Sequence, residues 1–183
     1  MTTPPTPPTQ TISYALGRGL LVWETWESVA GRPLGIQKAA IFDFASNYPR
    51  AFSDVVDGMR ATLRAHGVFE PDVSDLFAAR HFHTLRTQAT VVVNSLVARG
   101  LLEPGEPNDA EPEYVLTAEG RAVSRSLAGR HARATRAILE TLSTAWKSSS
   151  AETLRGLVAS SLPNQTVDIA DFVAAATKRT EAS

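Results

Sequence analysis

Histidine side chains are the residues of this sequence best suited to bind a metal or to transfer protons. There are four: His66, His81, His83 and His131. His81 and His83 form a His-x-His pair, which points both imidazoles to one side on a strand but in divergent directions on a helix. The surrounding pattern is helical, and the sequence has neither cysteine nor a His-Glu-x-x-His motif to complete a site. We therefore expect two polar residues on a helix surface, and no metal or other cofactor.

Two further segments contain residue types found in catalytic or nucleotide-binding sites. Asp43 lies between aromatic residues, where burial would raise the pKa of its carboxyl. Acid–base catalysis needs a second group, however, so we expect Asp43 to face solvent or to cap a neighbouring turn. Gly17-Arg18-Gly19 has glycines spaced as in a phosphate loop, but no strand precedes it and no Lys-Ser/Thr follows. The sequence therefore predicts a protein that is not an enzyme.

The overall composition predicts one globular domain with its own core. Of 183 residues, 43% are hydrophobic and 20% are charged, which excludes wholesale disorder. Eighteen Lys and Arg against nineteen Asp and Glu give a net charge of −1, so no global attraction to nucleic acid or anionic lipid is expected. The longest apolar stretch, Leu20 to Trp23, is too short to span a membrane. The absence of cysteine fits a cytoplasmic protein.

Apolar residues recur at helical spacing along most of the chain. This spacing predicts helices over residues 12–30, 36–47 and 52–66, then a longer helical segment that ends at Gly100, one or two helices over 117–146, and a helix that Ser150 caps. Leu101 and Leu102 begin a predicted strand, a polar loop follows, and Tyr114 to Leu116 form the return strand. Thr117 is a natural N-cap for the next helix.

This order of helix, strand, turn, strand and helix is typical of a winged-helix domain. The predicted fold is mainly α, with extra N- and C-terminal helices and a small two-stranded β wing, over residues 12–162. Residues 1–11 form a predicted disordered leader rich in proline and threonine, without the features of a signal peptide. Residues 163–183 form a linker and a short amphipathic tail.

Charge argues against DNA binding through the predicted wing. Residues 101–113 contain five acidic side chains and no basic one, and phosphate would repel them. Basic side chains gather later in the chain, where residues 119–147 contain six Lys or Arg and two Glu. Five of them form what we call the arginine stripe: Arg121, Arg125, Arg130, Arg133 and Arg136. The stripe could contact DNA backbone or an acidic protein, or form a solvated helix face. We slightly favour an acidic partner over DNA.

Three segments within residues 12–162 resemble a known family. They read LGIQKAAIFDFASNYP from Leu34, LVARGLLEP…EPEYVLTAEGRAVSRSL from Leu96, and LETLSTAWKSSSAETLRGLV from Leu139. Their order is similar to that of the middle component of ABC-type three-component systems, a group that includes the small C subunit of Lamassu antiphage defence. The resemblance implies a non-catalytic accessory subunit that docks on an SMC/Rad50-like ATPase and helps couple it to an effector protein, a nuclease or another toxic protein.

The winged-helix pattern also leaves a second function open, because winged helices bind DNA as well as proteins. In that alternative the chain is a transcription regulator of MarR/PadR-like type, and the long helical region 117–146 forms the interface of a dimer. The accessory-subunit hypothesis instead gives a partner-binding role to the apolar residues of the tail. A segment so short needs a surface on which to form a helix. Its first candidates are Ile169, Phe172 and Val173.

Overall fold

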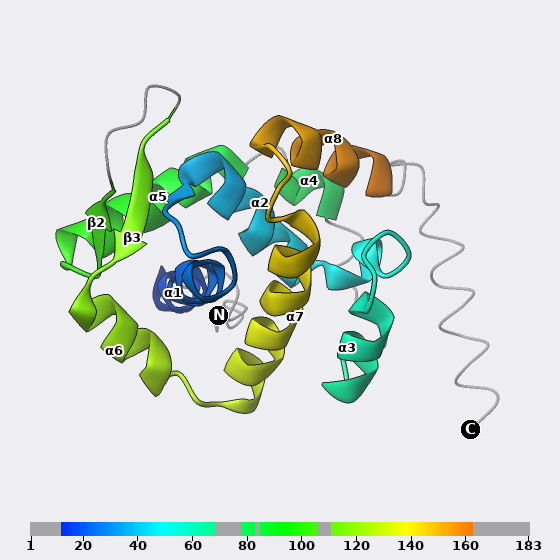
Figure 1. The fold of residues 1–183 in the computed structure, drawn as a ribbon, viewed down its shortest axis with the longest axis horizontal. Helices are drawn as coiled ribbons and strands as arrows, with labels where there is room; N and C mark the ends of the chain where they lie inside the picture. The colour runs from blue at the N-terminus through cyan, green and yellow to red at the C-terminus, as the bar shows by residue number, and fades with distance from the viewer. Residues whose placement is uncertain (1–11, 69–77, 83–84, 106–110, 163–183) are drawn as a thin grey trace, which may run out of the picture.

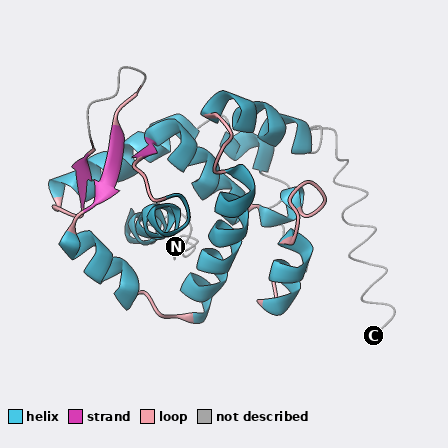
Figure 2. Cartoon of the chain, in the orientation of Figure 1, coloured by secondary structure: helices cyan, strands magenta, loops and turns pink. Residues whose placement is uncertain are grey.

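The computed structural model describes residues 12–68, 78–82, 85–105 and 111–162. This part of the chain is mainly helical, with a small antiparallel sheet at one side (Figures 1 and 2). The elements follow one another as α1 (Ile12–Ala30), β1 (Leu34–Gly35), α2 (Ile36–Asn47), the 3₁₀ helix η2 (Pro49–Phe52), α3 (Met59–Ala65), α4 (Ala78–Phe82), α5 (Leu85–Ala98), β2 (Leu102–Pro104), β3 (Glu113–Leu116), α6 (Ala118–Ser126), α7 (Arg130–Trp146) and α8 (Ala151–Ser161).

Helix α1 is the centre of this arrangement. Figure 1 views it almost end-on, and it packs against α2, α5, α6, α7 and β3. Its residues from Arg18 to Trp23 are all buried, which is the pattern of a helix enclosed on every side rather than of a surface helix with one apolar stripe. Gly19 lets α5 approach closely, because a Cβ at that position would lie 2.8 Å from a methyl group of Val92.

The charged side chains of α1 are paired with groups on other elements. Glu24 accepts hydrogen bonds from Arg136 Nε of α7 and from Ser124 Oγ of α6, both at 2.8 Å. Glu27 pairs with Arg121 at 3.0 Å and also accepts from the backbone N–H of Leu116 in β3. A carboxylate removed from water needs such donors, so these contacts determine how α6, α7 and the sheet attach to α1.

The sheet has three strands in the order β1-β3-β2, whereas the sequence predicts a two-stranded wing. β2 pairs with β3 in the register Leu102 to Leu116, and β1 adds a third strand by pairing Leu34 with Tyr114. A strand of two residues has no periodicity to recognise, which is why sequence analysis misses it. The two predicted strands themselves are confirmed, with boundaries at Leu102–Pro104 and Glu113–Leu116.

Most predicted helices agree with the structure, and one does not. The helices over 12–30 and 36–47 are confirmed, as are Thr117 and Ser150 as N-caps, whose hydroxyls accept from the backbone N–H groups of Gly120 and Thr153. The prediction of one helix over residues 52–66 is wrong in its first half. The chain there forms η2 and turns, and helix α3 begins only after Gly58, whose φ of 81° interrupts any helix. Region 117–146 consists of two helices.

Lys38 and Arg32 hold the C-terminal end of α7. Lys38 Nζ donates to the carbonyl oxygens of Lys147 and Ser149, at 3.2 and 2.8 Å, and lies 4.3 Å from the centre of the Trp26 ring. Arg32 donates to the same Lys147 carbonyl. Cations suit the negative end of a helix dipole. Burial, and then the charge of Arg32, lower the pKa of Lys38 to about 8.

Two helical glycines give opposite expectations for substitution by alanine. Within a helix this change normally stabilises, by about 0.5–1 kcal/mol. We expect Gly156→Ala in α8 to follow this rule, because nothing lies near the added Cβ. Gly120→Ala in α6 should instead destabilise by about 1–3 kcal/mol, because its Cβ would overlap the carbonyl oxygen of Leu101. Urea unfolding measures both changes, and a stabilised Gly120→Ala variant would contradict the packing of α6 on the sheet.

Candidate binding site

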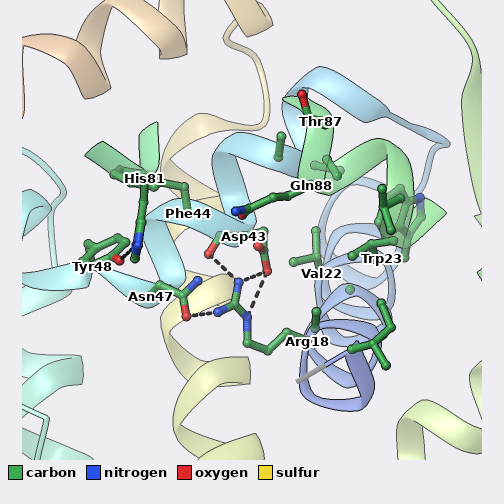
Figure 3. A pocket seen from close by; sticks show the side chains of 18 residues that line it. Arg18, Val22, Trp23, Asp43, Phe44, Asn47, Tyr48, His81, Thr87 and Gln88 are labelled. Carbon is green, nitrogen blue, oxygen red and sulfur yellow. Dashed lines mark hydrogen bonds and ion pairs between the residues drawn. The ribbon is translucent and has the colours of Figure 1, made fainter. Parts of the chain in front are cut away.

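A cavity of about 600 Å³ lies between α1, α2 and α5, with the end of α4 at its margin (Figure 3). We call it the α1–α2–α5 cavity. Its lining is mainly apolar and includes Ala15 and Val22 from α1 and Val92 from α5. Two large apolar side chains at its edge, Ile12 and Val91, are 50% and 51% exposed, which is unusual in a domain that buries most of its large apolar side chains.

An ion pair lies in the wall of this cavity, as Figure 3 shows. Arg18 from α1 pairs with Oδ1 of Asp43 from α2, with its Nε at 3.0 Å. Its Nη1 donates to Asn47 Oδ1, one helical turn further along α2. The Arg18 side chain is only 9% exposed, so its charge requires these acceptors. The sequence predicts that Asp43 faces solvent or caps a neighbouring turn, but in the structure its carboxylate pairs with Arg18. It compensates a buried arginine.

Sequence spacing could not reveal this pair. Arg18 and Asp43 are 25 residues apart on different helices. The available signal is compositional: Arg18 sits among small and apolar residues, from Ala15 to Val22, and a cation in such surroundings needs a carboxylate nearby if the segment is buried.

A second polar contact extends from Arg18 toward α7. The Arg18 guanidinium lies 5.5 Å from the centre of the Tyr14 ring, and Tyr14 Oη lies 2.5 Å from His131 Nε2. Partial burial raises the pKa of Tyr14, and partial burial together with the charge of Arg18 lowers the pKa of His131. A neutral imidazole beside a protonated phenol is therefore the favoured state near neutral pH.

His81 is separate from this group. His81, at the margin of the cavity, contacts the hydroxyl of Tyr48 through Nδ1, and the two rings lie 5.8 Å apart. His83 is outside the described residues, so its relation to His81 is not seen. Within the described part of the chain, no group of three or more His, Cys, Asp or Glu side chains is arranged to hold a metal ion.

The structure divides the arginine stripe into two groups. Arg121 and Arg136 turn toward α1 and pair with Glu27 and Glu24. Arg125, Arg130 and Arg133 are exposed on α6 and α7. The stripe is therefore not one continuous basic surface. The predicted tail residues Ile169, Phe172 and Val173 lie outside the described residues, as does the leader of residues 1–11.

Residues 87–98 of α5 and the described part of the β2–β3 hairpin contain no basic side chain. Arg86, in the first turn of α5, is the one basic residue of that helix, and its side chain lies outside the described residues. Exposed residues of α5 include Thr87, Val91 and Asn94, and the first basic side chain after them is Arg99, just beyond the helix. In the described part of the hairpin, Glu103 is exposed and Glu111 and Glu113 are half-buried. The described residues of this surface are thus neutral to acidic.

No protein-family model, curated protein or solved structure matches this chain. None of the described helices has both the length and the apolar character that crossing a membrane requires.

The partial burial of His131 and the nearby charge of Arg18 predict a pH effect. The pKa of His131 lies below its ordinary value of 6.5, so the unfolded chain binds this proton more tightly than the folded chain does. The contribution of His131 to stability should therefore be complete above pH 6.5 and should fall as the pH decreases from 6.5 to the folded pKa.

Titration of the histidine rings by NMR measures this pKa directly. Arg18→Met should raise the pKa of His131 part of the way toward 6.5, because burial, the larger cause, remains. Arg60→Met, which removes an exposed arginine paired with Asp54, is the matched control and should not move it. A His131 pKa at or above 6.5 in the unmodified protein would contradict this geometry.

Proposed function

We propose that the chain is a non-catalytic accessory subunit that docks on an SMC/Rad50-like ATPase and helps couple it to an effector protein. The observation that carries this proposal is the lack of basic side chains on residues 87–98 of α5 and on the described part of the β2–β3 hairpin. In a DNA-reading winged helix these elements approach phosphate and need basic side chains. The described residues here offer exposed valine, threonine and asparagine on α5 and glutamate on the hairpin. Such a surface suits a protein partner better than a duplex.

The order of elements supports a winged-helix arrangement as the framework for this role. Strand β1 follows α1, helices come next, and α5 leads directly into the β2–β3 hairpin. β1 pairs with β3, so the strand between the first two helices joins the hairpin in a single sheet. In this interpretation α5 is the helix that precedes the wing, and the α1–α2–α5 cavity lies beside it.

The alternative is a DNA-binding transcription regulator of MarR/PadR-like type. The element order is compatible with it, and three exposed arginines provide some basic surface. The proposed dimer helix, however, is divided between α6 and α7, and the apolar side of α7 is buried within the same chain. Ile138, Leu142 and Trp146 are each at most 4% exposed. A dimer would need another surface, so we favour the accessory subunit.

Binding to DNA separates the two functions. We expect the isolated protein to bind duplex DNA weakly, with strong dependence on salt, through Arg125 and Arg133. The double variant Arg125→Glu/Arg133→Glu should remove this binding, and it leaves the pairs made by Arg121 and Arg136 intact. The matched variant Asn94→Ala, on the exposed face of α5, should have no effect. Fluorescence anisotropy with duplexes of several sequences measures this. Tight sequence-specific binding that Asn94→Ala abolishes would favour the regulator.

Assembly with the ATPase tests the partner itself. We expect the chain to co-purify with an SMC/Rad50-like ATPase encoded beside it, and deletion of residues 167–183 to abolish co-purification while hardly changing the melting temperature. The substitution of Ile169, Phe172 and Val173 by alanine should have the same effect if these apolar side chains make the contact. Deletion of residues 2–11 is the control. A large fall in melting temperature with the complex intact would show that the tail completes the core instead.

A further inference from the structure

The α1–α2–α5 cavity has the size and lining of a small-molecule site. Ligand pockets are mostly apolar clefts of roughly 300–1,000 Å³ with a few polar groups that orient the ligand. This cavity has a volume of about 600 Å³, and its apolar wall is interrupted by the Arg18–Asp43 pair (Figure 3). The hydrogen-bond donors and acceptors of that pair determine which polar groups of a ligand the cavity can bind.

Arg18 has little donor capacity left for a ligand. Its Nε and Nη2 both contact Asp43 Oδ1, and Nη2 also lies 3.4 Å from the Asp43 carbonyl oxygen. Its Nη1 donates to Asn47 Oδ1. These contacts use four of the five N–H donors of the guanidinium, so an anionic ligand could reach only the remaining Nη1 donor, on a side chain that is only 9% exposed. The guanidinium thus disfavours a carboxylate or phosphate as the ligand.

Asp43, by contrast, retains acceptor capacity. Its side-chain contacts with Arg18 involve Oδ1, and Oδ2 accepts no hydrogen bond from any residue in the described part of the chain. The Asp43 side chain is 35% exposed, far more than that of Arg18, so an entering molecule meets the carboxylate first. An ionised carboxylate only accepts hydrogen bonds. The polar part of the cavity wall therefore selects a ligand that donates hydrogen bonds.

We propose that the α1–α2–α5 cavity binds a small organic amine, with its ammonium group on Asp43 and an apolar body against α1 and α5. An ammonium carries three donors and the charge that complements a carboxylate, and charge-assisted bonds are stronger than neutral ones. The apolar body contacts Ala15, Val22 and Val92. This site goes beyond the proposed accessory role, which requires a protein partner and no small ligand.

Three probes with nearly the same body test the proposal by isothermal titration calorimetry: phenethylamine, phenethyl alcohol and hydrocinnamate. We expect the amine to bind at least about tenfold more tightly than the alcohol, because only the amine is charged, and we expect no binding of the carboxylate. Equal affinities for all three probes would show that the cavity selects only the apolar body. No binding of the amine at millimolar concentration would also overturn the proposal.

Substitution of Asp43 gives a sharper result than loss of binding alone. Asp43→Asn leaves Arg18 as an uncompensated charge, so the preference should invert: amine affinity falls at least about tenfold, and hydrocinnamate begins to bind. The matched control Asp57→Asn removes an exposed carboxylate outside the cavity lining and should change neither affinity. An unchanged amine affinity in Asp43→Asn would contradict the assignment.

A second variant keeps the test decisive if Asp43→Asn fails to fold. Ala89→Leu adds volume at the cavity wall on α5 and leaves the Arg18–Asp43 pair untouched. It should weaken amine binding at least about tenfold by steric exclusion, with the melting temperature as a check on folding. Full amine affinity in a folded Ala89→Leu protein would place the amine elsewhere and would refute the site.

Discussion

The fold depends on the enclosure of α1, a helix that is buried on all sides yet carries charged side chains. A buried charge without a partner is strongly unfavourable, so each of these groups must meet a complementary group on a surrounding element. Arg18 meets Asp43 of α2, Glu24 meets Arg136 of α7, and Glu27 meets Arg121 of α6. These three pairs constrain which helix lies on which side of α1. The apolar contacts then supply most of the stabilisation.

The same constraint explains which charged residues remain available for binding. Pairing with α1 uses two of the five members of the arginine stripe, so the three exposed arginines do not form one continuous stripe with them. On the other side of α1, the Arg18–Asp43 pair is partly open, because α5 does not cover the carboxylate completely. The α1–α2–α5 cavity and residues 87–98 of α5, which carry no charged side chain, therefore lie side by side. This arrangement is the basis on which we propose a protein partner and a small-molecule ligand rather than nucleic acid.

Local signals in the sequence predicted much of the fold but little of the site. The Thr117 and Ser150 caps and Gly100 at the end of α5 all act within a few residues, and all are confirmed, as is the helix over residues 12–30. Local signals do not predict strand β1 or the start of α3. Pairing with β3 determines β1, and the left-handed conformation of Gly58 determines where α3 begins. The partners of Arg18, Arg121 and Arg136 lie far away in sequence. No spacing rule could identify these pairs.

A double-mutant cycle between Arg18 and Asp43 tests the central claim most directly. It compares the free energy of unfolding of Arg18→Met, Asp43→Leu and the double variant with that of the unmodified protein, by urea denaturation. If the pair compensates a buried charge, each single change leaves an uncompensated group, and the double variant is more stable than additivity allows. We expect a coupling energy of about 1 kcal/mol or more. Additive effects, to within ~0.3 kcal/mol, would contradict the account.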